Sequence, residues 1–134
     1  MKNIVIKTIP DDHQRYNTVG DYYTDENGNR IFAVSDMDNW KYEFLVVLHE
    51  LIESALCQDR KISDKQIDEF DIDFEEKRED NPDVGFPGDD PTAPYFKEHQ
   101  FATRIEKMMA EELNVDWNKY DELVAKLDRN TEVI

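Results

Sequence analysis

The longest apolar segment of the chain covers residues 41–57, KYEFLVVLHELIESALC. It contains no Gly or Pro, and its strong helix formers and apolar residues predict a buried helix. Three polar residues interrupt it: His49, Glu50 and Glu53. At about 100° per residue, His49 and Glu53 share one edge of this helix, and Glu50 lies about 60° from Glu53. Because unpaired buried charge is costly, these side chains must bind a ligand or form hydrogen bonds within the fold.

The N-terminal third has the pattern of strands. Residues 2–9 are rich in β-branched side chains and are followed by Pro10, which predicts one strand. Residues 19–24 and 30–35 flank a turn that contains Asn27-Gly28, and Asn-Gly between such segments is typical of a hairpin. The sequence therefore predicts a small antiparallel sheet made of a hairpin plus one strand.

The rest of the chain predicts three more helices. The capping-box pattern Ser63–Gln66 opens a second helix over residues 64–78, and a third covers residues 94–113. Asp116 caps a short last helix. The predicted fold class is α+β, with the small N-terminal sheet packed on the buried central helix and three further helices around it.

We expect a single domain over residues 1–134, because this length suits one core. Residues 1–36 form its sheet part and residues 37–134 its helical part. A Pro/Asp-rich loop at residues 79–94 divides the helices, and loops of this length are often functional. Such a loop is a candidate cover for a site.

The composition excludes several classes of function. The formal net charge of −16 argues against direct binding to nucleic acid or to an anionic membrane, because both need a basic surface. Cys57 is the one cysteine, which rules out an internal disulfide framework and a multi-cysteine zinc site. The chain begins without a signal peptide and has no apolar segment of about 20 residues, so we expect a cytoplasmic protein.

The sequence His49-Glu50-Leu51-Ile52-Glu53 has a spacing that suits a metal site. Side chains at i and i+4 of a helix can both reach one ion, which makes His49 and Glu53 candidate ligands. Glu50 lies close enough to accept a proton from a water that the ion has acidified. The pattern therefore predicts metal binding with hydrolysis as its chemistry.

A short antiparallel hairpin followed by a helix with H-E-L-x-[HE] resembles the core of the zincin metallopeptidases, over about residues 19–57. The resemblance implies that His49 is the first metal ligand and Glu50 the general base. Glu53 stands where that family has its second His. The whole chain also resembles small uncharacterised proteins of phages and prophages, which share stretches such as HELIE, DEFD and DPTAPY.

A third ligand must come from elsewhere in the chain. His99 lies at the edge of the inner face of the third helix, whereas His13 lies in a polar loop and is expected to be solvated. Asp71 is a candidate fourth ligand, or the acceptor of the outer ring N–H of a ligating His. The predicted site is thus His49, Glu53, His99 and Asp71, with zinc as the expected divalent ion. The alternative is a buried hydrogen-bond network around His49 that holds no metal.

Two further functions compete with the hydrolase. E-x-x-E and D-x-x-D on two helices (Glu50 and Glu53; Asp68 and Asp71) resemble the magnesium site of nucleotide pyrophosphatases of the MazG type, which implies magnesium or manganese. The acidic composition also fits a non-enzymatic phage protein that mimics the charge of DNA and binds a host protein. The hydrolase instead predicts a peptide or small-molecule substrate.

Overall fold

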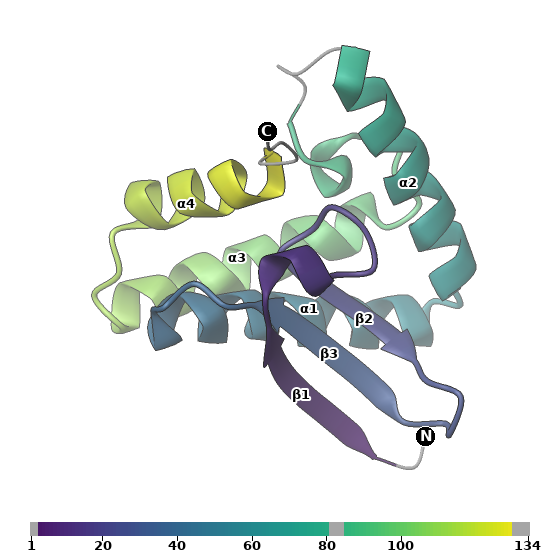
Figure 1. Ribbon diagram of the computed structural model, residues 1–134, viewed down its shortest axis with the longest axis horizontal. Coiled ribbons are helices and arrows are strands. Elements are labelled where there is room, and N and C mark those ends of the chain that lie inside the picture. The colour runs from purple at the N-terminus through teal and green to yellow at the C-terminus, as the bar shows by residue number, and fades with distance from the viewer. Residues whose placement is uncertain (1–2, 81–84, 130–134) are drawn as a thin grey trace.

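Figure 1 shows the computed structural model, which describes residues 3–80 and 85–129 and has the predicted α+β fold. An N-terminal sheet contains β1 (Ile4–Ile9), β2 (Gly20–Thr24) and β3 (Arg30–Ser35). The helices that follow are α1 (Trp40–Asp59), α2 (Asp64–Asp80), α3 (Phe96–Glu112) and α4 (Trp117–Arg129). Two short 3-10 helices, η1 (Asp11–His13) and η2 (Pro87–Asp89), lie in the connections.

The predicted hairpin is formed by β2 and β3, which pair antiparallel with Tyr22 opposite Phe32. Asp25 closes its turn, because its Oδ1 accepts hydrogen bonds from the backbone N–H groups of Asn27 (2.9 Å) and Asn29 (2.8 Å). Gly28 has a φ of 85°, a conformation that glycine adopts without steric cost. The Asn-Gly signal in the sequence therefore has a direct structural cause.

β1 corrects one detail of the prediction, because the sheet is mixed rather than wholly antiparallel. β1 pairs in parallel with β3, from Ile4 opposite Arg30 to Ile9 opposite Ser35, so the strand order is β1-β3-β2. The connection after β1 crosses to the far edge of β3, where β2 begins. Side-chain pattern alone does not fix a strand's partner or direction, and the hairpin leaves one edge of β3 free for β1.

The helix predicted over residues 41–57 is α1, which begins one residue earlier and ends two residues later. The side chain of Asn39 caps it by accepting hydrogen bonds from the backbone N–H groups of Lys41 and Tyr42. α1 packs against β2 and β3 and along α3 (Figure 1). Among the described residues, no helix has both the length and the apolar character needed to cross a membrane.

The apolar core consists of two clusters. The first includes Leu45 and Tyr120, and the second includes Tyr22 and Tyr95. Tyrosines of both clusters direct their hydroxyl groups at buried carboxylates: Tyr120 donates to Glu106, Tyr22 to Glu53 and Tyr95 to Asp71. A polar centre therefore lies where the two clusters meet, and it contains the residues that the sequence singles out.

Candidate metal centre

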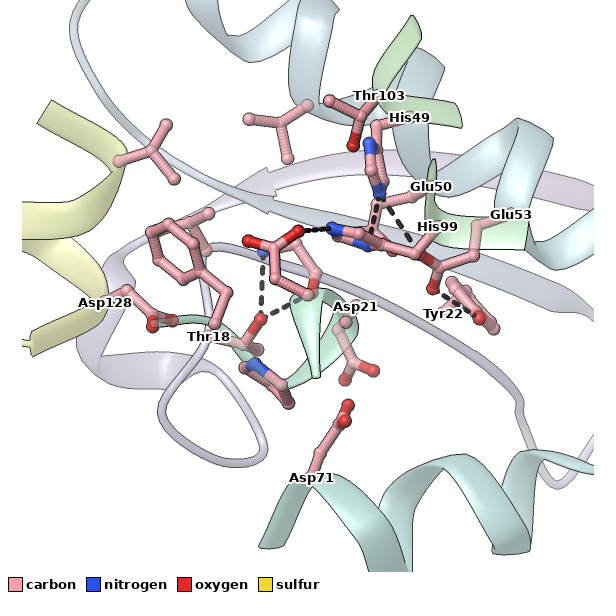
Figure 2. A pocket seen from close by; sticks show the side chains of 18 of the residues that line it. Thr18, Asp21, Tyr22, His49, Glu50, Glu53, Asp71, His99, Thr103 and Asp128 are labelled. Atoms are coloured by element: carbon pink, nitrogen blue, oxygen red, sulfur yellow. Dashed lines mark hydrogen bonds and ion pairs between the residues drawn. The ribbon is translucent and has the colours of Figure 1, made fainter. Parts of the chain in front are cut away.

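α1 and α3 bring three side chains together, as Figure 2 shows. His49 Nε2 lies 3.1 Å from Glu53 Oε2 and 3.1 Å from His99 Nδ1. His99 Nδ1 lies 2.9 Å from the same Glu53 oxygen. His49 and Glu53 are one helical turn apart on α1, and His99 comes from the first turn of α3. The predicted ligands His49, Glu53 and His99 thus form a compact group that could hold a metal ion.

The outer ring nitrogen of each histidine faces a carboxylate. His49 Nδ1 lies 2.7 Å from Glu106 Oε1, and His99 Nε2 lies 3.2 Å from Asp89 Oδ1. An ionised carboxylate only accepts hydrogen bonds, so each outer nitrogen carries a hydrogen and donates it. When such a ring is neutral, its inner nitrogen, His49 Nε2 or His99 Nδ1, directs a lone pair inward.

Three acceptor atoms consequently converge on one point: two inner nitrogens and a carboxylate oxygen. Three lone pairs about 3 Å apart repel one another unless a positive charge lies between them. A proton on one inner nitrogen would satisfy part of the group, but protons on both would place two N–H groups against each other at 3.1 Å. The geometry therefore calls for either one shared proton or a single cation.

The pKa values of the three groups also show that the centre favours a bound positive charge. Burial alone would lower the pKa of His99, but hydrogen bonds to Asp89 and Glu53 outweigh it and raise the pKa from 6.5 to about 9. Burial likewise opposes the charged form of His49, yet its bonds to Glu106 and Glu53 raise its pKa well above 6.5. Burial would raise the pKa of Glu53, but hydrogen bonds from His49 and His99 lower it to about 2. Without a metal, this centre holds protons strongly.

The donor set also fits a metal ion. Two histidines and one carboxylate are the protein ligands of several catalytic zinc sites, with Zn–N and Zn–O distances of about 2.0–2.2 Å. Ligand atoms around a tetrahedral zinc lie roughly 3.4 Å apart, so the three atoms here would need to separate by only a few tenths of an ångström. Hydrogen bonds from the outer ring nitrogens to carboxylates are the usual support of ligating histidines.

Tyrosine hydroxyls hold the carboxylates of this centre in place. Tyr22 donates to Glu53 Oε1 at 2.8 Å, which leaves Oε2 directed at the two histidines. Tyr120 donates to Glu106 Oε2, while Glu106 Oε1 accepts from His49. Glu53 and Glu106 therefore each have one oxygen fixed by a tyrosine and one directed at a histidine.

Glu50 lies in the same cavity but takes no part in this network. Among the described residues, no hydrogen bond or ion pair to its carboxylate is found. Burial and the nearby charge of Glu53 raise the pKa of Glu50 well above 4.5. Its Oε1 lies 2.6 Å from the position that a Cβ at residue 20 would occupy, so only glycine at position 20 leaves room for it. The sheet is thus shaped to accept the Glu50 carboxylate.

Asp71 lies in the cavity wall rather than in the ligand group. Its two oxygens accept hydrogen bonds from Tyr16, at 3.0 Å, and from Tyr95. Burial raises its pKa to about 7. The ring nitrogens of the histidines pair with Glu106 and Asp89 and not with Asp71, so that part of the sequence prediction is corrected. A role for Asp71 as a fourth ligand stays a prediction.

Two residues of the centre were not among the predicted ligands or their partners. Glu106 lies two turns after His99 on α3, a spacing that is visible in the sequence and that places both residues along one flank of the helix. Asp89 belongs to η2, in the Pro/Asp-rich segment, and no sequence pattern links it to His99. The solvated position predicted for His13 is confirmed, because 67% of its side chain is exposed.

The centre opens into a cavity of about 180 Å³. β2 contributes Gly20, Asp21 and Tyr22 to its wall, and α2 contributes Asp68 and Asp71. Residues 16–19, the segment around η2 and one face of α4 complete it. The described part of the 79–94 segment therefore borders the site, since its residues 86–89 line the cavity.

Gly88 offers a direct test of how the centre is built. A Cβ at this position would overlap the ring of His99 at Nδ1, Cγ and Cε1. We expect Gly88→Ala to displace that ring and to weaken zinc binding by about 10- to 100-fold, as for other changes that disturb ligand orientation. Gly85→Ala is the matched control, because a Cβ there meets no atom within 4 Å. Equal zinc affinities of the two variants in a competition titration would contradict this account.

Comparison with known proteins identifies no relative. No protein-family model, no curated protein sequence and no solved structure matches the chain. A function for the protein is therefore inferred from the geometry of the centre and from the spacing of its residues along α1.

Proposed function

We propose that the protein is a metal-dependent hydrolase with a zinc-type centre. The observation that carries the proposal is the convergence of His49 Nε2, His99 Nδ1 and Glu53 Oε2, each held in place by a partner on its other side. A polar centre of this kind in an apolar core is costly unless its groups bind a ligand or form hydrogen bonds. A divalent cation satisfies all three atoms at once.

The roles of the residues follow from their positions. His49, Glu53 and His99 would hold the ion, which would supply Lewis-acid chemistry toward a water and a carbonyl group. Glu50, which lines the same cavity, would accept the proton of the attacking water. The resemblance of H-E-x-x-E to the zincin helix supports this assignment, as does a third candidate ligand from a later helix.

The first experiment measures the metal content of the untagged protein by elemental mass spectrometry, beside Glu50→Gln. We expect about one equivalent of zinc in both proteins and loss of amide or peptide hydrolysis in the variant alone. Loss of the metal in Glu50→Gln would make Glu50 a ligand and would overturn its role as base. Two histidines and one carboxylate also suit Fe(II), so iron in place of zinc would redirect the chemistry to oxidation.

The pyrophosphatase alternative has weaker support. Glu50, Glu53, Asp68 and Asp71 do line one cavity, as two helices bearing E-x-x-E and D-x-x-D would require. However, no Lys or Arg of the described chain lines it, so no side-chain cation there could meet a triphosphate. Binding to a host protein through the acidic surface stays a prediction.

A further inference from the structure

The wall of the cavity is acidic. Ten of the described residues that line the cavity are Asp or Glu, and none of them is Lys or Arg. A cleft lined by one sign of charge and bounded by apolar walls focuses the electric field and concentrates ions of the opposite sign. This arrangement bears on which substrates can enter.

Neighbouring cations compensate only part of this charge. Arg15 pairs with Asp21 at 2.7 Å and with Asp68 at 3.3 Å. Arg78 pairs with Glu75 at 3.1 Å and with Asp128 at 2.6 Å. Even with these two arginines and a divalent ion in the His/Glu/His group, the ten acidic side chains that line the cavity in the described part of the chain outnumber these positive charges. Its potential is therefore negative in the metal-loaded form as well.

Asp121 is an exposed carboxylate that lines the cavity. It lies on α4 directly after Tyr120, whose hydroxyl group binds Glu106. Among the described residues no hydrogen bond or ion pair to it is found. Partial burial and the nearby Glu106 and Asp89 raise its pKa, which is the sign of a group surrounded by like charge. Lys107, whose charge acts in the opposite direction on the pKa of Asp121, lies over the ring of Trp117.

The cavity is small and partly apolar. Its volume of about 180 Å³ lies below the roughly 300–1,000 Å³ typical of pockets for drug-sized ligands, so it suits one amino-acid side chain. The apolar part of its wall includes Val46, Ile67, Phe86, Trp117 and Val124. A side chain with an aliphatic stem and a charged tip matches this combination of apolar wall and acidic rim.

We infer that the substrate is an amide or peptide with a positively charged side chain, a primary ammonium or a guanidinium, and that Asp121 helps to select it. This inference rests on the proposed hydrolase function and specifies its substrate class. The aliphatic stem packs on the apolar wall, and the charged tip is held by the carboxylates at the rim. Anionic side chains are repelled.

The test compares three compounds of matched backbone: the methylamides of Nα-acetyl-lysine, Nα-acetyl-norleucine and Nα-acetyl-glutamate. Each is titrated into the full-length, zinc-loaded protein and followed by NMR, with zinc content measured on the same samples. We expect the lysine compound to bind at least tenfold more tightly than the norleucine compound, and the glutamate compound not to bind. Raising the salt concentration should weaken only the lysine compound, because salt screens charge.

Two variants locate the effect. Asp121→Asn should reduce the preference for lysine over norleucine several-fold. Glu122→Gln, which removes the same charge from an exposed neighbour that does not line the cavity, should leave that preference unchanged.

Equal binding of the lysine and norleucine compounds, a preference for glutamate, or binding of none of the three would overturn the inference. If zinc is bound in any of these cases, the proposed metal centre stands and only the substrate class fails. If the protein selects the lysine compound but takes up no zinc, the proposed cation selectivity is supported and the proposed hydrolase function is overturned.

Discussion

Replacing His49 by alanine will lower the affinity for zinc by at least 100-fold. The variant loses one of the three converging donor atoms and also leaves the Glu106 carboxylate without its histidine partner. Loss of an outer-shell partner alone typically costs 10- to 100-fold in metal affinity, and loss of a ligand should cost more. Competition titration against a chromogenic chelator measures the effect.

Three comparisons make this result specific. His99→Ala and Glu53→Ala should behave like His49→Ala, whereas His13→Ala should bind zinc like the wild type because His13 is exposed and remote from the centre. Circular dichroism of each variant separates loss of the site from loss of the fold. Unchanged zinc affinity in a folded His49→Ala variant would contradict the metal centre. The group would then be a buried hydrogen-bond network.

The stability of the metal-free protein will fall as the pH rises from about 6.5 to 9. The pKa of His99 is raised from 6.5 to about 9 in the folded state, so the folded protein binds this proton more tightly than the unfolded chain does. The stabilisation is complete below pH 6.5 and is lost as the pH passes through 9. A shift of this size corresponds to about 3 kcal/mol of unfolding free energy.

Glu53 determines how the stability of the metal-free protein changes at acid pH. Its pKa is lowered from 4.5 to about 2, so its contribution is present above pH 4.5 and is lost as the pH falls toward 2. The metal-free protein should therefore be most stable between about pH 4.5 and 6.5. Urea unfolding at a series of pH values, in the presence of a chelator, measures this profile.

Zinc should remove the loss at alkaline pH, because the ion takes the place of the proton among the three donor atoms. Zinc affinity should rise over the same range, since binding must displace that proton. Metal-free stability that does not change between pH 6.5 and 9 would contradict the protonation state inferred for the histidines.

The sequence by itself determined the elements and half of the centre. The apolar pattern of residues 41–57 specified α1, and Asn27-Gly28 specified the hairpin, because these signals act between residues close in the chain. The same helical periodicity placed His49 and Glu53 on one edge of α1, so their proximity needs no tertiary information. His99 followed as a candidate because histidines are few.

Only the tertiary structure decided the direction of β1 and the partners of the two histidines. α3 illustrates the reason: two of its four buried positions are the carboxylates Glu98 and Glu106, and the other two are Ala102 and Ala110, so its apolar residues alone do not define its buried face. The rotation of α3 about its axis depends on its packing against α1, and this rotation carries Glu106 to His49. Asp89 and Gly88 reach His99 only because η2 packs against the start of α3, a contact that local sequence patterns do not encode.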